Sequence, residues 1–317
     1  MKLGDDFKLG LRRELERRIA DGTLPEPMRK VLGGAGLALK QPRHAGALLA
    51  AAAPAADVRV QTVVNAFESP SLLIRDHSFA APASDTWAAV LEPRRGVLEA
   101  MIPAVGRIEV EHHPSRRWIG TGVLAAPTVV VTNRHVALQM AVESADGWRF
   151  APGAGGQAIA ARIDFLEEHG VAAIAEFALD DVLAVENAGG PDLAFLRVEA
   201  HEDLPGHAAL GGSLAREEAV AAIGYTSEET GVPPELEEIL TGIFGAVYNV
   251  KRLAPGRVLA IGGGHISHDC STQGGNSGSA LVEIESGLVA GIHFEGGVTE
   301  NHAVPADVVR ARLDAVA

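Results

Sequence analysis

The chain has 317 residues, enough for one large domain or for a domain with an appended segment. Its 47% hydrophobic and 21% charged residues are typical of a folded globular protein and exclude wholesale disorder. A formal net charge of −14 argues against nucleic acid as the main partner, because neutralising phosphates requires a basic surface.

The sequence favours a location inside the cell. No run of about 18 uncharged apolar residues is present, so we expect no membrane span. Asp5 and Asp6 stand where a secretory signal peptide would need its apolar stretch. Because Cys270 is the single cysteine, no intrachain disulfide can form. We therefore expect a cytoplasmic protein.

The first 97 residues differ from the rest in charge and pattern. Residues 1–60 carry eleven Lys or Arg and seven Asp or Glu, a balance of +4 that leaves −18 for the remainder. Apolar residues recur every four positions from Phe7 to Ile19, which predicts an amphipathic helix over residues 5–21. We interpret residues 1–97 as a small, mainly helical extension that regulates the following domain or docks a protein partner.

The rest of this extension shows weaker patterns. An Ala- and Leu-rich stretch predicts a helix over residues 44–53, and residues 57–64 favour a strand. Three prolines indicate an irregular linker over residues 68–93.

From about Leu98 the pattern becomes that of a β protein. Short β-branched runs are separated by polar or proline-containing breaks, which favours a sandwich or barrel over alternating strands and helices. Residues 306–316 predict a terminal helix. The expected strands are Val105–Glu111, Ile119–Ala125, Thr128–Thr132, Ala194–Val198, Val220–Gly224, Arg257–Ile261, Ala280–Ile284 and Leu288–His293.

Three segments of this β region carry chemistry. They are Thr132–Ala137 (TNRHVA), which follows the Gly120–Gly122 (GTG) stretch, Gly190–Leu196 (GPDLAFL) and Gly274–Ser279 (GGNSGS). Each alone is typical of ordinary turns or core packing. Together they occur in the chain order His, Asp, Ser.

These segments resemble the trypsin-like, chymotrypsin-fold serine peptidases, whose catalytic residues follow that order, whereas other folds use other orders. The resemblance covers residues 98–317 and implies a mostly β domain of two barrels with a C-terminal helix. It is nearest to the bacterial branch that includes the glutamyl endopeptidases, through residues 271–279 (STQGGNSGS), 291–293 (GIH) and 301–305 (NHAVP).

The resemblance and the chemistry of these groups imply the same roles. Ser277 would be the nucleophile, which needs a base to take its proton. His135 would be that base, since its unperturbed pKa of about 6.5 lets it take and return a proton near pH 7. Asp192 would orient the imidazole, and the N–H groups of Gly275 and Ser277 would form an oxyanion hole.

Three further residues bear on control and specificity. Animal digestive relatives carry Asp before the nucleophile and are activated when a newly cut N-terminus pairs with it; Asn276 cannot form that ion pair, so we expect no such activation. Thr272 and His293 match the two positions that hold the substrate Glu carboxylate in the glutamyl branch. That branch also uses a free N-terminus near the pocket, whereas residues 1–97 precede the domain here. A small or neutral preference is the alternative.

Other clusters have ordinary explanations. Cys270 is expected to be a small buried residue, and Lys251 and Arg252 to lie on a solvated strand edge. A metal site is the less favoured interpretation of one histidine-rich group, which we expect to form the pocket wall or to make hydrogen bonds. This group comprises His265, His268 and Asp269, with His112 and His113.

We therefore expect a bacterial-type serine endopeptidase that acts on protein or peptide substrates and needs no metal or organic cofactor. The alternative from another class is a pseudo-peptidase that serves as a protein-binding module. An esterase or acyl-transfer enzyme with the same triad is a third hypothesis, which nothing in the sequence favours.

Overall fold

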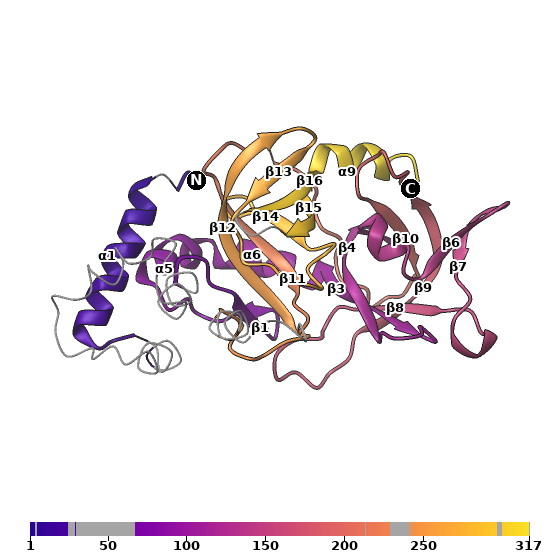
Figure 1. Cartoon of the computed structure of the whole chain (residues 1–317), viewed down its shortest axis with the longest axis horizontal. Coiled ribbons are helices and arrows are strands. Elements are labelled where there is room, and N and C mark those ends of the chain that lie inside the picture. The colour runs from indigo at the N-terminus through magenta and orange to yellow at the C-terminus, as the bar shows by residue number, and fades with distance from the viewer. Residues whose placement is uncertain are drawn as a thin grey trace, which may run out of the picture.

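Two six-stranded antiparallel β-barrels lie side by side in the computed structural model (Figure 1). Barrel 1 is closed in the order β10-β5-β4-β3-β8-β9. Barrel 2 has the order β11-β14-β15-β16-β13-β12 and is closed by pairing of β11 with β12. The predicted mostly β, two-barrel fold is confirmed. The structure describes residues 1–3, 5–24, 29, 67–212, 214–228, 241, 243–296 and 300–316.

The strands match the β-branched runs of the sequence. Barrel 1 contains β3 (Val105–Glu111), β4 (Trp118–Ala126), β5 (Val129–Thr132), β8 (Ala160–Asp164), β9 (Glu176–Val185) and β10 (Ala194–Val198). Barrel 2 contains β11 (Ala219–Tyr225), β12 (Lys251–Gly262), β13 (His265–His268), β14 (Ala280–Glu283), β15 (Val289–Gly296) and β16 (Asn301–Pro305). A separate hairpin pairs β6 (Ala141–Ser144) with β7 (Gly147–Phe150).

Alternate residues of β5 face two different cores. Val130 packs with Leu124 and Leu196 inside barrel 1. Val131 belongs to a second cluster, which also holds Ile223 of barrel 2. Because successive side chains of a strand point to opposite faces, β5 is buried on both and forms an uninterrupted apolar run.

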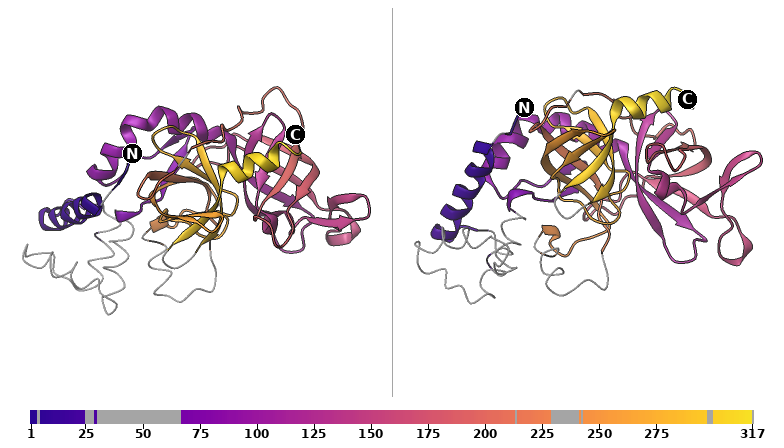
Figure 2. Two further views of the ribbon diagram at one scale, coloured as in Figure 1. Left: turned by 90° about the horizontal axis from the view of Figure 1, so that it is seen from above. Right: turned by 45° about the horizontal axis from the view of Figure 1, so that its top comes forward.

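The helices lie outside the barrels. The predicted helix over residues 5–21 is confirmed as α1 (Asp5–Asp21). The terminal helix α9 (Ala306–Leu313) runs beside both barrels (Figure 2), and Arg312 on it forms an ion pair of 2.7 Å with Glu186 after β9. The remaining helical segments are α5 (Asp85–Leu91), η2 (Glu92–Arg94), α6 (Arg95–Met101), η3 (Ile102–Ala104), α7 (Arg134–Ala137) and η4 (Ala154–Gly156).

The prediction of an irregular linker over residues 68–93 is wrong. This stretch holds β1 (Leu72–Arg75), β2 (Ser78–Phe79) and α5. β1 pairs with β12, and the Ser84 side chain caps α5 by accepting a hydrogen bond from the Trp87 N–H. The three prolines lie outside these three elements and do not interrupt them. The helix predicted over residues 44–53 and the strand predicted over 57–64 lie outside the described residues.

Lys251 and Arg252 do not lie on a solvated edge, so that prediction is also wrong. Both side chains are buried. Lys251 Nζ donates to the Phe165 carbonyl and to Glu168, and the Arg252 guanidinium donates to the carbonyl of Ser71. These long cations therefore reach inward and satisfy backbone carbonyls of other segments.

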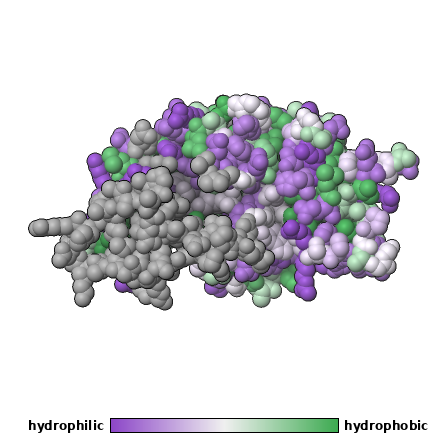
Figure 3. Space-filling view, in the orientation of Figure 1, coloured by the Kyte–Doolittle hydropathy of each residue, from purple (hydrophilic) through white to green (hydrophobic). Residues whose placement is uncertain are grey.

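The division between residues 97 and 98 stays a prediction. Helix α6 crosses it, and one hydrophobic cluster includes Phe67 and Ile74 from before it and Val105 from after it. No helix in the described parts of the chain is long and apolar enough to cross a membrane. On the face shown in Figure 3, hydrophilic and hydrophobic residues are interspersed wherever the surface is coloured.

A buried carboxylate joins α1 to the start of α5. Glu14 accepts hydrogen bonds from the N–H groups of Asp85 and Thr86 and from the hydroxyls of Thr86 and Ser84, and Arg18 donates to it from one turn further along α1. Burial raises the pKa of Glu14, but these hydrogen bonds outweigh it and lower the pKa from 4.5 to about 2. Such a carboxylate stabilises the folded state only while it is ionised.

We therefore expect Glu14→Gln to destabilise the docking of α1. Because the folded pKa is lowered, the stabilisation is fully present above pH 4.5 and is lost as the pH falls towards 2, and it amounts to about 2–3 kcal/mol. Chemical denaturation followed by tryptophan fluorescence measures it, because the ring of Trp87 lies against Phe7 of α1 with the ring centroids 4.8 Å apart. Glu16→Gln on the same helix is the control. An equal loss in both variants, or a loss that persists at pH 2, would contradict the prediction.

Candidate active site

Strand pairing in barrel 1 brings the predicted base and its orienting carboxylate together. β5 and β10 are antiparallel with Thr132 opposite Ala194, so the segments that carry His135 and Asp192 meet at one edge. His135 Nδ1 lies 2.6 Å from Asp192 Oδ2, and the His135 backbone N–H donates to Asp192 Oδ1 at 3.1 Å. The Asn133 amide donates to the Asp192 carbonyl at 2.9 Å. This arrangement fixes the imidazole in one orientation and keeps Nε2 available.

The pKa of Asp192 favours the charged carboxylate beside His135. Burial raises its pKa, but the hydrogen bond from His135 and the charges of His135 and Arg134 outweigh burial, so the pKa of Asp192 lies below its ordinary value. The carboxylate is therefore ionised at neutral pH. It stabilises an imidazolium when His135 takes a proton.

Ser277 lies in the turn between β13 and β14 and is held against barrel 1. Its carbonyl accepts the Thr121 N–H from β4 at 2.9 Å, and the N–H of the next residue, Gly278, donates to the His293 carbonyl at 2.9 Å. Gly120 permits this approach, because a Cβ there would lie 3.1 Å from the Ser277 carbonyl oxygen and 2.9 Å from Val136. Among the described residues the Ser277 hydroxyl has no hydrogen-bond partner. In enzymes without substrate this contact to the base is often long.

The loop before Ser277 presents two backbone donors. Within the described part of the chain, neither the Gly275 N–H nor the Ser277 N–H has an acceptor. Gly275 adopts φ +88, which favours glycine, and a Cβ there would lie 2.3 Å from the Trp118 ring. Trp118 is a residue that the sequence analysis missed. Two such donors can stabilise an oxyanion.

Asn276 stabilises this loop without a charged partner. Its amide nitrogen donates to the Thr226 hydroxyl at 3.0 Å and to the Gln273 carbonyl at 3.2 Å, and its amide oxygen accepts from the Ser279 hydroxyl at 3.3 Å. The side chain is buried. All of these hydrogen bonds join uncharged groups. A carboxylate side chain at the same buried position would instead need a cation beside it.

The two predicted pocket residues lie on neighbouring segments of barrel 2 and do not contact each other directly. Thr272 donates to Asn301 Oδ1 at 2.9 Å, and Asn301 pairs with Gly296 on β15. His293, on the same strand, is 2% exposed, and its Nδ1 lies 3.3 Å from His268 Nε2. Burial, together with the charges of His135 and His302, lowers the pKa of His293 to about 3. His293 is therefore neutral at pH 7.

Two cavities flank the site. One of about 780 Å³ is lined by His135 and Asp192 and by Phe294 and Glu295 of β15. The other, of about 460 Å³, is lined by Gly275 and Trp118. The predicted base and the oxyanion-hole loop thus each border a space that a peptide can enter.

The histidine-rich group does not gather around one point. His265 contacts His302 edge to face with ring centroids 4.7 Å apart, whereas His268 faces His293. Cys270 is fully buried, as predicted.

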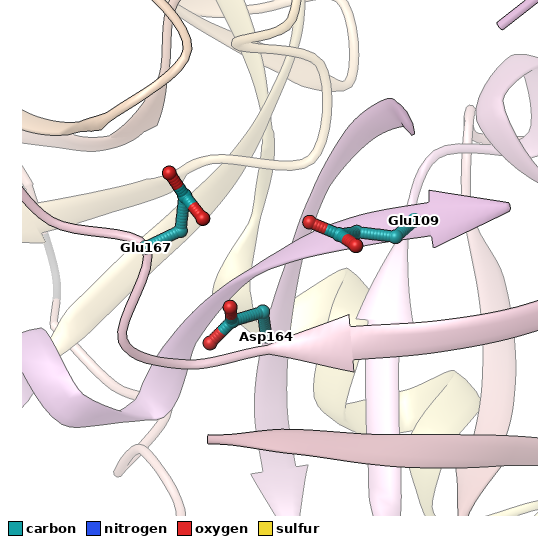
Figure 4. A group of neighbouring side chains, drawn as sticks. All are labelled: Glu109, Asp164 and Glu167. Carbon is teal, nitrogen blue, oxygen red and sulfur yellow. The ribbon is translucent and has the colours of Figure 1, made fainter. Parts of the chain in front are cut away.

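One cluster of carboxylates does gather, and it was not predicted. Figure 4 shows Glu109, Asp164 and Glu167 close together. Arg107 forms ion pairs with both glutamates, and Asp164 accepts the Leu166 N–H at 2.7 Å. The cluster is thus balanced by its own chain, and we assign no metal to it.

Comparison with known proteins agrees with the geometry. Residues 120–292, more than half of the chain, match the trypsin-like peptidase domain family. The chain is 26% identical over 291 residues to a probable serine protease of Lysobacter enzymogenes, covering 78% of this chain and 72% of that protein.

Two solved structures are also similar. The serine endoprotease from Yersinia pestis has a TM-score of 0.48 and 19% identity, covering 70% of this chain and 66% of that one. The inactive form of a mutant of Rv3671c from M. tuberculosis H37Rv has a TM-score of 0.45 and 18% identity, covering 72% of this chain and 92% of that one. The family match, by contrast, covers most of both barrels. The chain therefore belongs to the trypsin-like peptidase domain family.

Proposed function

We propose that the protein is a serine endopeptidase in which Ser277, His135 and Asp192 act as a catalytic triad. The contact of 2.6 Å between His135 Nδ1 and Asp192 Oδ2 is the observation that carries the proposal. It leaves Nε2 of the imidazole for the proton of the nucleophile.

In the proposed reaction Ser277 Oγ attacks the carbonyl carbon of the scissile bond and gives its proton to His135 Nε2. The N–H groups of Gly275 and Ser277 donate to the resulting oxyanion. When the C–N bond breaks, His135 returns the proton to the leaving amine, and an acyl-enzyme remains on Ser277. A water molecule, deprotonated by His135, then attacks the ester and releases the acid product and Ser277 Oγ–H.

A fluorophosphonate probe tests the proposal against the pseudo-peptidase alternative. The probe labels an activated serine, so we expect one adduct, on Ser277, located by mass spectrometry. Labelling should disappear in His135→Ala, in which the serine keeps its position and loses its base. A protein that hydrolyses no peptide and takes up no probe would be a binding module.

The same proposal includes a preference for Glu before the cut. Thr272 and His293 would bind the carboxylate, with the Thr272 hydroxyl turning from Asn301 Oδ1 to the substrate. The His268–His293 contact supports it. If His268 Nε2–H donates to His293 Nδ1, the second nitrogen of His293 carries the other proton and can donate to a carboxylate. Hydrogen bonds to charged groups are the stronger kind. A small or neutral preference is the competing outcome.

We expect His293→Ala to lower kcat/KM for Glu substrates by about tenfold or more, with matched Gln substrates less affected. The Glu-to-Gln ratio of the wild type should stay constant between pH 6 and 9, because the pKa of His293, about 3, keeps it neutral throughout. Kinetics on paired peptides measure both. A ratio that falls as the pH rises would mean that Glu binding needs a protonated histidine. A cleavage profile dominated by Arg, Lys or large apolar residues would exclude the acidic pocket.

Residues 1–97 form the regulatory part of the proposal. Ser271, at the start of the nucleophile loop, donates to the Ser69 carbonyl at 2.6 Å, and β1 pairs with β12 next to it. Through these contacts the extension touches the loop that carries Ser277. Because we expect Glu14→Gln to loosen α1 in the full-length chain, kcat/KM of this variant should differ from that of Glu16→Gln. Equal kinetics would contradict a regulatory role for α1.

A further inference from the structure

The smaller of the two cavities is basic, although the whole chain carries a net charge of −14. We call it the arginine cavity, since three arginines line its volume of about 460 Å³. Glu228 is the one acidic residue among its described lining residues.

The three arginines are not equivalent. Arg107 is half-buried and already paired with Glu109 and Glu167, and it donates to the Asn249 carbonyl at 2.7 Å. Arg116 and Arg117 are exposed, and neither forms an ion pair within the part of the chain that the structure describes. Two cations in this cavity are therefore open to an anionic group.

The backbone holds these two residues in place. The Arg116 N–H donates to His113 Nδ1 at 3.0 Å, and the Arg117 carbonyl accepts the Val110 N–H from β3 at 2.9 Å. Their guanidinium groups therefore extend from a fixed turn, which reduces the entropy cost of binding an anion.

Trp118 connects the arginine cavity to the oxyanion hole. Its ring lies against Gly275, where a Cβ would approach it to 2.3 Å, and the Arg107 guanidinium lies 5.7 Å from the ring centroid. The cavity thus begins at the residue whose N–H would hold the scissile carbonyl oxygen. The larger cavity is lined by Phe294 on β15, the strand that also carries His293, and it shares no described lining residue with the arginine cavity. Since we propose that His293 binds the residue before the cut, we place the arginine cavity on the leaving-group side of the bond.

We propose that the arginine cavity binds the side-chain carboxylate of an Asp or Glu within the first two residues after the scissile bond. This inference rests on the proposed peptidase function and adds a second determinant of specificity to it. Guanidinium groups match carboxylate geometry with paired N–H donors. Because Arg116 and Arg117 are exposed, the attraction is modest and weakens with salt.

The experiment compares peptides that differ only by Asp or Asn at the first or the second position after the cut. At low salt we expect kcat/KM to be about fivefold higher for the better Asp peptide than for its Asn partner. The double variant Arg116→Gln/Arg117→Gln should bring this ratio close to one. Arg13→Gln/Arg149→Gln is the matched control, since it removes the same charge from exposed arginines outside the cavity and should keep the ratio.

A second readout needs no turnover. The Ser277→Ala variant should bind the Asp peptide more tightly than the Asn peptide in fluorescence anisotropy, and the double arginine change should remove that difference. An Asp-to-Asn ratio near one in the wild type, or one that survives the double change, would overturn the inference while hydrolysis stands. Absence of Ser277-dependent hydrolysis would instead overturn the proposed function, and the anisotropy difference would still decide whether the cavity binds carboxylates.

Discussion

Ser277→Ala is expected to lower kcat/KM on a peptide substrate by about 10⁴-fold or more while leaving the fold intact. The hydroxyl is the proposed nucleophile, and without it no acyl-enzyme can form on this residue. Stability should change little, because the Ser277 hydroxyl has no hydrogen-bond partner among the described residues. The Gly275 and Ser277 N–H donors remain in the variant, so a residual rate above that in water is expected.

Two companion variants separate the roles within the triad. His135→Ala should be about as severe as loss of the serine, since a hydroxyl without a base is a poor nucleophile. Asp192→Asn should cost about 10⁴-fold, because an amide that donates to Nδ1 imposes the wrong imidazole tautomer. Ser286→Ala, an exposed serine in the turn after β14, is the control. Wild-type turnover in purified Ser277→Ala would show that the nucleophile lies elsewhere.

The site was predictable where chemistry depends on short motifs. The glycines around Ser277 are needed for close backbone approach, since a Cβ at Gly278 would lie 1.9 Å from the Thr121 carbonyl oxygen. Such a requirement is visible in the sequence as a short motif rich in glycine. His135 and Asp192 are 57 positions apart, yet each sits at the end of an apolar run that predicts a strand. Pairing of β5 with β10 then brings them together.

Contacts between residues far apart in the sequence could not be predicted in this way. Lys251 and Arg252 were assigned to a solvated edge because charged residues usually are solvated. Their acceptors at Phe165 and Ser71 lie 86 and 181 positions away, so no local pattern reports them. The arginine cavity was not predicted for the same reason. Its walls come from β3, β4, the segment after β11 and the nucleophile loop.

Prolines misled the prediction for residues 68–93. Pro70 precedes β1, Pro82 precedes α5, and Pro93 lies in the first turn of η2. Proline is tolerated at such boundaries, since the missing N–H would have no partner there. The number of prolines therefore indicated an irregular linker, although the spacing between them allowed short elements.

A buried ion pair connects both barrels with the N-terminal hairpin. Lys251 of β12 donates to Glu168, which follows β8, at 3.2 Å, and also to the carbonyls of Ile102 and Phe165. Glu168 in turn accepts the His77 N–H at 2.8 Å from the turn between β1 and β2. Burial lowers the pKa of Lys251 from 10.5 to about 8, against the opposing charge of Glu168, so its ammonium is still protonated at pH 7.

Lys251→Met should therefore lower the free energy of unfolding by about 3–5 kcal/mol, because it leaves a carboxylate buried without its cation. Denaturation at pH 7 measures the loss, and Lys2→Met, at an exposed lysine, is the control. The double variant Lys251→Met/Glu168→Leu should recover part of the stability, since replacing both ions by apolar groups removes the unpaired charge. If the single variant were as stable as the wild type, the pair would not hold the two barrels together. If the double variant were less stable than the single one, the lost contacts of Glu168 with His77 would outweigh the removal of the unpaired charge.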